Sequence, residues 1–293
     1  MIIVKIIGGM GNQLFQYAAG RRLALHHNVP LKLDVSGFAT YTWHIYSLKP
    51  FALEATQEAT PEEIDRANPA GRKGLSGKVS RLCRKLRLPQ NKVFWEAKVR
   101  PYDVGFLKAG PNTYLDGYWQ CEKYFLDIAD DIRREFTIKV PQDDASRKVA
   151  DEIKTVNAVS LHVRRGNYVS LPEVNRVHGT CSIEYYQECI AQIAQKVKDP
   201  RFFVFSDDPE WARDNVKIPF PTTYVAGNGV GRDYEDLRLM SSCRHFILAN
   251  SSFSWWGAWL AANPDKIVLA PKRWFTDPAI DTRELTPPGW LRI

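Results

Sequence analysis

The sequence predicts an α/β protein with parallel sheets in two domains. Short apolar runs rich in β-branched residues alternate with segments of helical periodicity, as strands and helices do around parallel sheets. Several of these runs end in glycine or polar residues, and the carboxyl ends of parallel strands are where such sheets bind ligands. A polar stretch with a proline, 140–144, separates two such series in a chain of 293 residues. That length is sufficient for two cores.

The first series predicts a domain that spans 1–143 and opens with a strand, a glycine loop and a helix. The run of glycines from Gly8 to Gly11 breaks the first apolar segment, and Asn12 is a suitable N-cap for the helix that follows. The expected elements are strand 1–7, helix 13–25, strand 31–34, strand 114–119 ending in a turn, and helix 124–136.

The second series predicts a domain that spans 144–293. Its strands and helices alternate without an internal repeat, which favours a second parallel sheet covered by helices. The expected elements are strand 158–163, helix 182–198, strand 202–205, strand 222–225, helix 233–242, strand 246–249, helix 254–262, and strand 267–270 as the edge that closes the sheet.

The cysteines and the apolar segments of the sequence indicate the cellular compartment of the protein. The five cysteines are odd in number and form no C-x-x-C pair, so we expect neither a disulfide framework nor a thiolate zinc site. The N-terminus lacks the basic start and cleavage site of a signal peptide, and no apolar run has the length needed to cross a bilayer. These features favour a cytoplasmic protein.

The net charge of +7 is concentrated in one segment. Residues 66–100 contain eleven Lys and Arg against one acid, Glu96, and leucines recur there at helical spacing from Leu75 to Leu86. Such a basic amphipathic helix either rests on an anionic membrane surface or is a solvated helix with its apolar stripe on the core. No recognition motif supports binding to nucleic acid.

Gly9-x-Gly11 after the first strand admits a dinucleotide interpretation, in which Asp34 at the end of the second strand holds a ribose. The third glycine of that fingerprint is absent, because Leu14 occupies its place. The alternative is a tight turn that lets Asn12 and Gln13 face a cleft.

Two segments in the second series suit a diphosphate. Arg164 and Arg165 follow a strand directly, and a guanidinium grips phosphate oxygens with a planar fork. Ser251 and Ser252 start a helix, where free N–H groups and the helix dipole attract anions. Asp207 and Asp208 are adjacent to Pro209 in a strand-end turn, where they suit a turn or a nucleoside contact better than a metal ion.

Taken together, these segments resemble a known family. The stretches GGMGNQLFQYAAGRRLA (8–24), LDGYWQCEKYF (115–125), LHVRRGNYV (161–169), FFVFSDDPEW (202–211), YEDLRLMSSCRHFILANSSFSWWGAWL (234–260) and APKRWF (270–275) are similar to the α-1,2-fucosyltransferases of glycosyltransferase family 11. The resemblance runs in order over nearly the whole chain. It implies a GT-B fold, in which two Rossmann-like domains face each other across a cleft, and places the acceptor in the N-terminal domain and GDP-fucose in the C-terminal one.

The resemblance also implies an inverting transfer of L-fucose from GDP-β-L-fucose to the 2-hydroxyl of a terminal β-galactoside, without metal or cofactor. It allows the C-terminal tail to return to the N-terminal domain and the acceptor glycan to be lipid-linked, docked near the 66–100 segment. It implies a phosphate role for Arg164 and a place at the reaction centre for Asn12. To these we add Asp116 as a catalytic candidate, and Gln13, Trp119 and Glu122 as the expected acceptor contacts. The donor contacts it implies are His162, Arg164, Arg165, Asp207, Asp208, Asn250, Ser251, Ser252 and Phe253.

One position departs from the family pattern. Members usually read H-x-R-R-x-D, whereas position 167 here is Asn, which keeps an acceptor oxygen and loses the charge. Two alternatives therefore remain. One is a fucosyltransferase of another linkage, and the other is a GDP- or glycan-binding protein without turnover. The inverting step needs either a base for the acceptor hydroxyl or a late proton transfer to solvent or phosphate, and the candidates for the base are Asp116 and Glu122, and after them Asp34.

Overall fold

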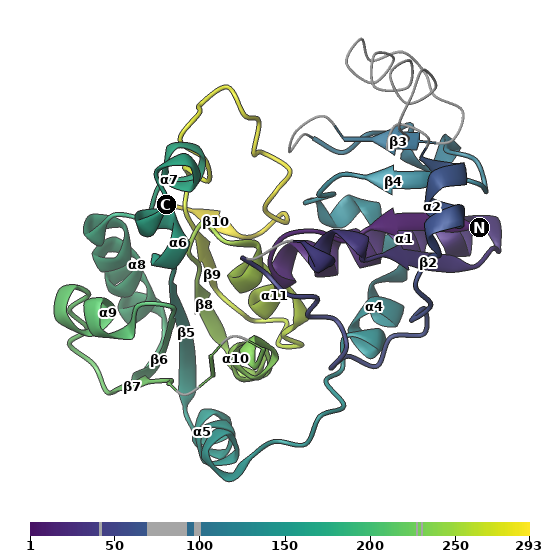
Figure 1. Cartoon of the computed structure of the whole chain (residues 1–293). Helices are drawn as coiled ribbons and strands as arrows, with labels where there is room; N and C mark the ends of the chain where they lie inside the picture. Colours follow the sequence, from purple (N-terminus) through teal and green to yellow (C-terminus); the bar gives the residue numbers. More distant parts are fainter. Residues whose placement is uncertain (41–42, 69–92, 97–100, 227, 230) are drawn as a thin grey trace. The chain divides into compact units, whose positions relative to one another are not determined.

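The computed structural model describes residues 1–40, 43–68, 93–96, 101–226, 228–229 and 231–293. The chain divides into two compact units (Figure 1). Unit 1 contains Met1–Lys139 and Asp281–Leu285, and unit 2 contains Val140–Ile280 and Thr286–Ile293. The chain therefore passes from one unit to the other at three points. Each unit has its own parallel sheet, which confirms the predicted α/β class.

Unit 1 has a four-stranded sheet with the order β2-β1-β4-β3, and all three pairings are parallel. Its strands are β1 (Ile2–Lys5), β2 (Leu31–Asp34), β3 (Val93–Trp95) and β4 (Tyr114–Asp116). Its helices are α1 (Met10–His27), η1 (Ser36–Ala39), α2 (Pro61–Ala67), η3 (Phe106–Lys108), η4 (Glu122–Tyr124), η5 (Leu126–Ile128) and α4 (Ala129–Glu135).

Helix α1 begins earlier than the sequence predicted. Gly9, in an extended conformation, is its N-cap, so the prediction that Asn12 caps the helix is wrong. Gly8 has a φ of +76°, which lets the chain turn sharply from β1 into the helix. The helix ends at Asn28, whose left-handed conformation and backbone N–H cap the last carbonyls.

The expected helix over 124–136 is shorter in the structure. Two 3-10 turns, η4 and η5, precede a regular helix of seven residues, α4. At the start of this stretch Tyr124 and Phe125 are buried in the core of unit 1. Tertiary packing of these rings thus accounts for local geometry that the apolar periodicity did not predict.

Unit 2 has a six-stranded parallel sheet with the order β10-β9-β8-β5-β6-β7. Its strands are β5 (Asn157–Val163), β6 (Pro200–Ser206), β7 (Thr222–Tyr224), β8 (His245–Ile247), β9 (Val268–Ala270) and β10 (Leu291–Arg292). Strand β9 does not close the sheet as predicted, because the last residues of the chain add β10 outside it. A two-residue strand carries no periodicity by which a sequence could reveal it.

The helices of unit 2 cover both faces of its sheet. In Figure 1, α8 and α9 lie on one face, and α10 and α11 lie on the other. These helices are α5 (Asp144–Thr155), α6 (Gly166–Ser170), α7 (Pro172–His178), α8 (Ile183–Lys196), α9 (Pro209–Asn215), α10 (Asp233–Ser242) and α11 (Ser252–Leu260).

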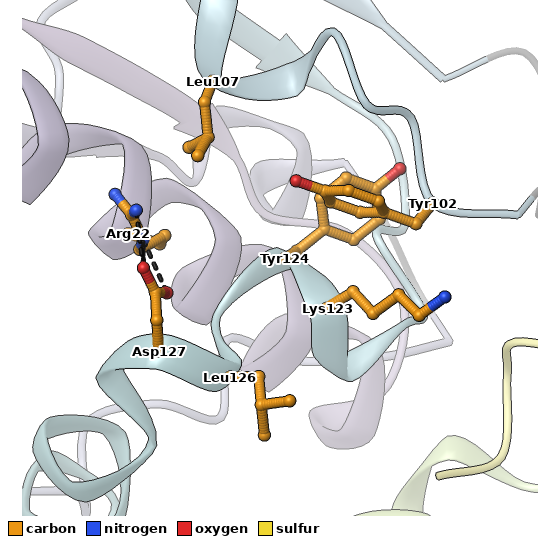
Figure 2. A pocket seen from close by; sticks show the side chains of 7 residues that line it. All are labelled: Arg22, Tyr102, Leu107, Lys123, Tyr124, Leu126 and Asp127. Atoms are coloured by element: carbon orange, nitrogen blue, oxygen red, sulfur yellow. Dashed lines mark hydrogen bonds and ion pairs between the residues drawn. The ribbon is translucent and has the colours of Figure 1, made fainter. Parts of the chain in front are cut away.

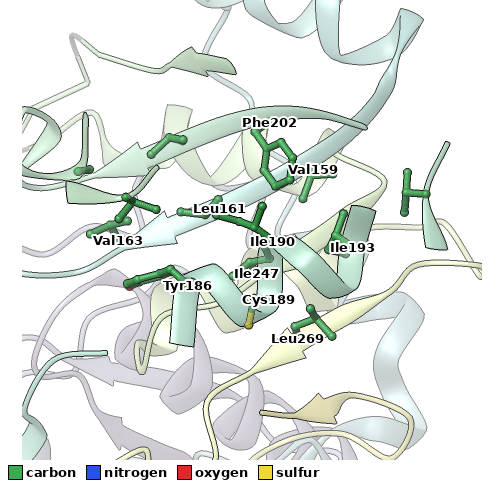
Figure 3. Close-up of a cluster of buried hydrophobic side chains, with 14 residues drawn as sticks. Val159, Leu161, Val163, Tyr186, Cys189, Ile190, Ile193, Phe202, Ile247 and Leu269 are labelled. Atoms are coloured by element: carbon green, nitrogen blue, oxygen red, sulfur yellow. The ribbon is translucent and has the colours of Figure 1, made fainter. Parts of the chain in front are cut away.

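The core of unit 2 explains how its central strand, β5, sets the direction of the site residues. Val159, Leu161 and Val163 of β5 pack against Tyr186 and Ile190 of α8 (Figure 3). Because successive strand residues face opposite sides of a sheet, the intervening His162 is directed to the other face, where α11 begins. The apolar alternation of β5 therefore fixes the direction of His162 and the level at which Arg164 leaves the sheet.

Two expectations concern parts of the chain that the structure covers incompletely. The basic amphipathic helix proposed within 66–100 lies almost wholly outside the described residues. Among the helices that are described, none combines the length and the apolar character needed to cross a bilayer.

Candidate functional site

The carboxyl end of β5 holds Arg164 in a fixed orientation. Its guanidinium lies 3.0 Å from the carboxylate of Asp207 and donates a hydrogen bond of 2.8 Å to the side-chain oxygen of Asn167. It also lies 5.3 Å from the ring centroid of Tyr168. About a quarter of the Arg164 side chain remains exposed. A guanidinium has five N–H donors, so donors remain for an anion beyond the two protein contacts.

Arg165 is held by different partners. Its guanidinium carbon lies 3.7 Å from the centroid of the Trp211 ring, close enough for a cation–π contact. Its Nε lies 3.3 Å from Asp208, which also caps α9 by accepting a hydrogen bond from the backbone of Trp211. Arg165 and Asp208 therefore stabilise the start of α9 together. The two adjacent arginines are thus differently placed, and Arg164 has the geometry of an anion ligand.

Gly166 permits the close approach of Asp207. The backbone N–H of Arg165 donates a hydrogen bond of 2.8 Å to Asp207. A Cβ at position 166 would lie 3.0 Å from Cγ of Asp207 and nearer still to its Oδ2. Only glycine therefore allows Asp207 to contact both arginines at the distances observed.

The start of α11 lies beside His162. Ser251 is the N-cap of this nine-residue helix and accepts a hydrogen bond of 3.3 Å from the backbone N–H of Phe253. The ring of Phe253 lies 5.8 Å from the ring of His162. The structure therefore brings the end of β5 and the amino end of α11 together, as the sequence predicted for these two segments.

Asn250 has a different position from the one expected of a donor contact. It is buried, and its side-chain amide donates to the carbonyls of His178, Gly179 and Trp274. Its hydrogen-bonding groups are thus used to connect the end of α7 to the loop after β9. This placement contradicts a direct donor contact through its side chain and shows that Asn250 supports the site.

Burial and charge set the protonation of two neighbours of Arg164. Burial, assisted by the Arg164 charge, lowers the pKa of His162 to about 3, so the imidazole is neutral at physiological pH. Its Nδ1 is buried and has no hydrogen-bond partner within the described chain. Burial raises the pKa of Asp233 at the start of α10, and the Arg164 charge opposes that shift. Asp233 therefore belongs to the surroundings of Arg164, although the sequence did not indicate it.

In unit 1, the glycine loop after β1 contains Asn12. The side-chain amide of Gln120, just after β4, donates a hydrogen bond of 2.7 Å to Asn12. Gln13, in contrast, is fully buried: it donates to the carbonyls of Gly8 and Ile45 and accepts from the backbone of Ser47, each at 2.8 Å. The predicted acceptor contact by Gln13 is therefore wrong, because its side chain is used to hold a neighbouring loop.

The side chain of Trp119 is also inaccessible to a sugar ligand. Its side chain is 0% exposed and packs among the rings of Phe94, Phe106 and Tyr124. The prediction that Trp119 contacts an acceptor is therefore wrong. It fails because a tryptophan beside a turn is as easily recruited into the core as left at the surface.

The three carboxylates considered as a base are placed as follows. Asp34 accepts hydrogen bonds from the backbone and hydroxyl of Ser36 and, at 2.5 Å, from the hydroxyl of Tyr114. These contacts use its carboxylate to hold the end of β2 in place. Asp116, the last residue of β4, pairs with Lys5 at 3.3 Å. Glu122 begins η4 and is largely buried. Asp34 and Asp116 both end strands that flank β1 and its glycine loop, and of the two Asp34 has the closer protein partners.

A pocket of about 480 Å³ also lies in unit 1 (Figure 2). It is lined by Arg22, Tyr102, Leu107, Lys123, Tyr124, Leu126 and Asp127. An ion pair of 2.6 Å between Arg22 and Asp127 forms one wall. Arg22 is ten residues after Asn12 along α1, about 15 Å along the helix axis. None of the predicted site residues lines this pocket.

Sequence reasoning missed several residues that shape the site. Tyr168 contacts Arg164, Trp211 supports Arg165, and Asp233 is near enough for the charge of Arg164 to act on its carboxyl. A signal was present for Trp211, because it lies one helical turn after Asp208, a suitable N-cap followed by proline. For Asp233 no local signal exists, since its proximity to Arg164 depends on the order of the strands.

The chain was compared with known proteins. Residues 96–293 match the model described as glycosyl transferase family 11. An α-1,2-colitosyltransferase from Escherichia coli is 33% identical over 303 residues, which cover 100% of this chain and 99% of the relative. A galactoside α-(1,2)-fucosyltransferase 1 from Rattus norvegicus is 31% identical over 169 residues, 55% of this chain and 44% of the relative.

Among solved structures, a mutant of FUT1 from Arabidopsis thaliana in complex with GDP has a similar fold. The TM-score is 0.54 at 13% sequence identity, and the match covers 94% of this chain and 72% of that one. This likeness confirms the GT-B type of fold expected from the sequence. On the match of residues 96–293 to the family model and on the full-length likeness to the bacterial relative, the chain belongs to glycosyl transferase family 11 and is a glycosyltransferase.

Proposed function

We propose that this protein transfers L-fucose from GDP-β-L-fucose to the 2-hydroxyl of a terminal β-galactoside, forming an α-1,2 linkage with inversion and without a metal ion. The observation that carries the proposal is that the end of β5, which holds Arg164 in a fixed orientation, lies beside the amino end of α11 in unit 2. The family membership and the names of the relatives support the α-1,2 linkage and the galactoside acceptor.

The physical argument concerns the leaving group. When the C1–O bond of the sugar breaks, negative charge develops on the β-phosphate of GDP, and fixed positive charge must stabilise it. Arg164 supplies a guanidinium whose orientation is already set by Asp207 and Asn167, and the start of α11 supplies backbone N–H groups. His162 is neutral, so it adds no charge and acts as a hydrogen-bonding neighbour.

Asn167 is compatible with turnover. The carboxylate usual at this position of the family is replaced by an amide whose oxygen still accepts the hydrogen bond from Arg164. Because Asp207 also contacts Arg164, the guanidinium retains a carboxylate partner. The proposal of an active enzyme is therefore favoured over that of a binding protein without turnover.

On the acceptor side, we propose Asp116 as the base that receives the proton of the attacking hydroxyl, with Asn12 as a hydrogen-bonding neighbour. Asp116 ends β4, and Gln120, four residues later, connects that loop to Asn12. In the transfer, the hydroxyl oxygen bonds to C1 as the bond from C1 to GDP breaks, and the hydroxyl proton passes to the base.

Colitose is the second candidate for the transferred sugar. The observation that favours it is the full-length likeness to an α-1,2-colitosyltransferase. Colitose is fucose without the 3-hydroxyl, so both donors present the same nucleotide and the same leaving group. A site that hydrogen-bonds the 3-hydroxyl would reject colitose strongly, whereas an apolar site would discriminate weakly.

The cellular compartment in which the reaction takes place is a further proposal. Cys121, Cys181, Cys189 and Cys243 are all free thiols, as suits a reducing compartment, and we propose that the protein acts in the cytoplasm. Docking of the 66–100 segment near a lipid-linked acceptor remains a proposal that sedimentation with anionic liposomes would test.

The experiment compares transfer of radiolabelled sugar from GDP-fucose and from GDP-colitose to lactose, in EDTA and in Mg²⁺. Transfer from GDP-fucose in EDTA with an α-1,2 product is the expected result, and the ratio of kcat/KM for the two donors decides between them. Tight GDP binding with no transfer from either donor would support the alternative of a binding protein.

The Arg164→Lys variant tests the phosphate role, because it keeps a charge and loses the planar fork. We expect kcat/KM to fall about 100-fold, as on loss of one oxyanion donor. Arg147→Lys is the matched control, since this exposed arginine of unit 2 pairs with Asp144 on α5. Near-normal turnover by Arg164→Lys would contradict the role given to Arg164.

A further inference from the structure

Three loops meet at the carboxyl edge of the sheet in unit 1. Strand β1 lies between β2 and β4, so the glycine loop after β1 is adjacent to the loop after β4. The hydrogen bond from Gln120 to Asn12 connects these two loops directly. A third segment, 43–47, is attached to the glycine loop by Gln13, which bonds Ile45 and Ser47 on one side and Gly8 on the other.

The side chain of His44 confirms how close the third segment comes. A Cβ placed on Gly9 would lie 3.4 Å from Cε1 and 3.6 Å from Nδ1 of His44. The imidazole therefore packs against the glycine loop three residues before Asn12. A Cβ at position 9 would be in ordinary van der Waals contact with this ring, so His44 lies directly against the loop.

Two large aromatic side chains are exposed on these segments. Trp43 is 46% exposed and adjoins His44, and Tyr118 is 37% exposed and follows β4. The backbone N–H groups of Tyr118 and Trp119 both donate to the carboxylate of Glu96, at 2.6 and 2.8 Å. This double contact fixes the loop so that Trp119 is buried while Tyr118 faces outward.

We propose that Trp43 and Tyr118, with His44 and Asn12 between them, form the acceptor subsite for a β-galactoside. The inference deepens the proposed function and rests on it. Galactose has an axial 4-hydroxyl, which leaves the hydrogens of C3, C4 and C5 as one continuous apolar face, and an exposed aromatic ring covers such a face. The amide of Asn12 and the imidazole of His44 supply the few polar contacts that orient a ligand in an otherwise apolar site.

This assignment replaces Gln13 and Trp119 by their neighbours. Gln13 holds the segment that carries Trp43 and His44, and Trp119 is the buried residue next to exposed Tyr118. In both cases the residue expected to contact the acceptor instead supports the one that does.

The test uses the full-length protein and lactose. Trp43→Ala and Tyr118→Ala are expected to raise the KM for lactose at least tenfold, while the KM for the GDP-sugar stays within twofold of the wild type. Both side chains are well exposed, so we expect the variants to fold, which far-ultraviolet circular dichroism would show. Leu126→Ala is the control, because Leu126 is 50% exposed and lines the pocket near Arg22, to which neither Trp43 nor Tyr118 contributes.

Binding without transfer separates the inference from the proposed function. Saturation-transfer NMR with lactose alone is expected to show contact with the wild type and its loss in both variants. Tyr118→Phe retains the ring and is expected to retain binding. Unchanged KM and unchanged NMR contact in Trp43→Ala and Tyr118→Ala would overturn the subsite, whereas lactose contact in a protein that transfers no sugar would support the subsite and contradict the proposed function.

Discussion

Replacing Gly166 by alanine tests how the arginines are positioned without removing any charged group. The new Cβ would lie 3.0 Å from Cγ of Asp207 and closer still to its Oδ2, at a separation shorter than real Cβ atoms show. The carboxylate must therefore retreat, by roughly 1 Å or more if its Oδ2 is to reach an ordinary van der Waals separation from the new Cβ. That shift stretches the 2.8 Å hydrogen bond from Arg165 and the 3.0 Å pair with Arg164.

The expected cost follows from those two contacts. A hydrogen bond to a charged group contributes about 1.5–3 kcal/mol. Because both Asp207 and Arg164 are partly exposed, water replaces some of this interaction, and a loss near the lower end of the range is expected. About 1.4 kcal/mol corresponds to a tenfold change in an equilibrium constant. We therefore expect Gly166→Ala to weaken GDP binding about tenfold and to lower kcat/KM by at least that factor.

Isothermal titration with GDP measures the binding, and radiolabelled transfer measures the turnover. Gly229→Ala is the matched control, because it lies in unit 2, has an ordinary φ and would place its Cβ in open space. A Gly166→Ala protein whose GDP affinity and turnover equal those of the wild type would refute the claim that Asp207 positions Arg164.

Three further predictions concern stability. Burial raises the pKa of Asp236 to about 7, well above its unfolded value, so the folded state holds the proton more tightly and stability falls as pH rises from about 4 to 7. Asp236→Asn is therefore expected to be more stable than the wild type at pH 8, by up to about 4 kcal/mol, with no gain at pH 4. Equal melting temperatures of the two proteins at pH 8 would contradict a cost of burying the ionised Asp236 carboxylate. The pKa of His162 is lowered to about 3, so the folded state resists its protonation, and stability should be lost as pH falls from about 6.5 towards 3. His162→Gln should flatten this acid limb in thermal unfolding, and an unaltered limb would argue against the effect. Gln13→Ala removes three hydrogen bonds and deprives the carbonyl of Gly8 and the buried N–H of Ser47 of this partner, whereas the carbonyl of Ile45 still accepts from the hydroxyl of Ser47. The expected cost is about 2–4 kcal/mol in urea unfolding, and Gln187→Ala, which removes an exposed hydrogen bond made from α8, should cost little. Equal losses would show that the hydrogen bonds of Gln13 contribute no more than an exposed one.

The regular parts of the fold were predictable because their periodicity is strong. Strand 158–163 and helix 233–242 are present within one residue of expectation, since each has a clear apolar pattern and a polar end. Strand β3 was not predicted, because its three residues follow a long basic stretch and gain their pairing only from β4. Short edge strands such as β3 and β10 depend on their partners, which the local sequence does not identify.

For the candidate site, the sequence indicated segments better than individual side chains. Strand-end arginines and a serine-capped helix were identified by residue type, and the structure brings both to the same edge of one sheet. The direction of each side chain was harder to predict. Asn250 and Gln13 lie in the expected segments, but their side-chain amides donate to backbone carbonyls of the protein. Whether a polar side chain faces a ligand or a backbone carbonyl depends on packing, which residue type alone does not determine.

The route of the last residues affects how this protein can be divided. Residues 281–285 belong to unit 1, where Glu284 accepts a hydrogen bond from the backbone of Tyr102 and pairs with Lys123, and β10 then belongs to unit 2. A gene cut between Lys139 and Val140 would thus deprive the first fragment of Glu284, while a cut after Ile280 would remove an edge strand from the second. Neither half can be expressed intact as a contiguous piece, so domain swaps between relatives must exchange the tail together with the body it completes.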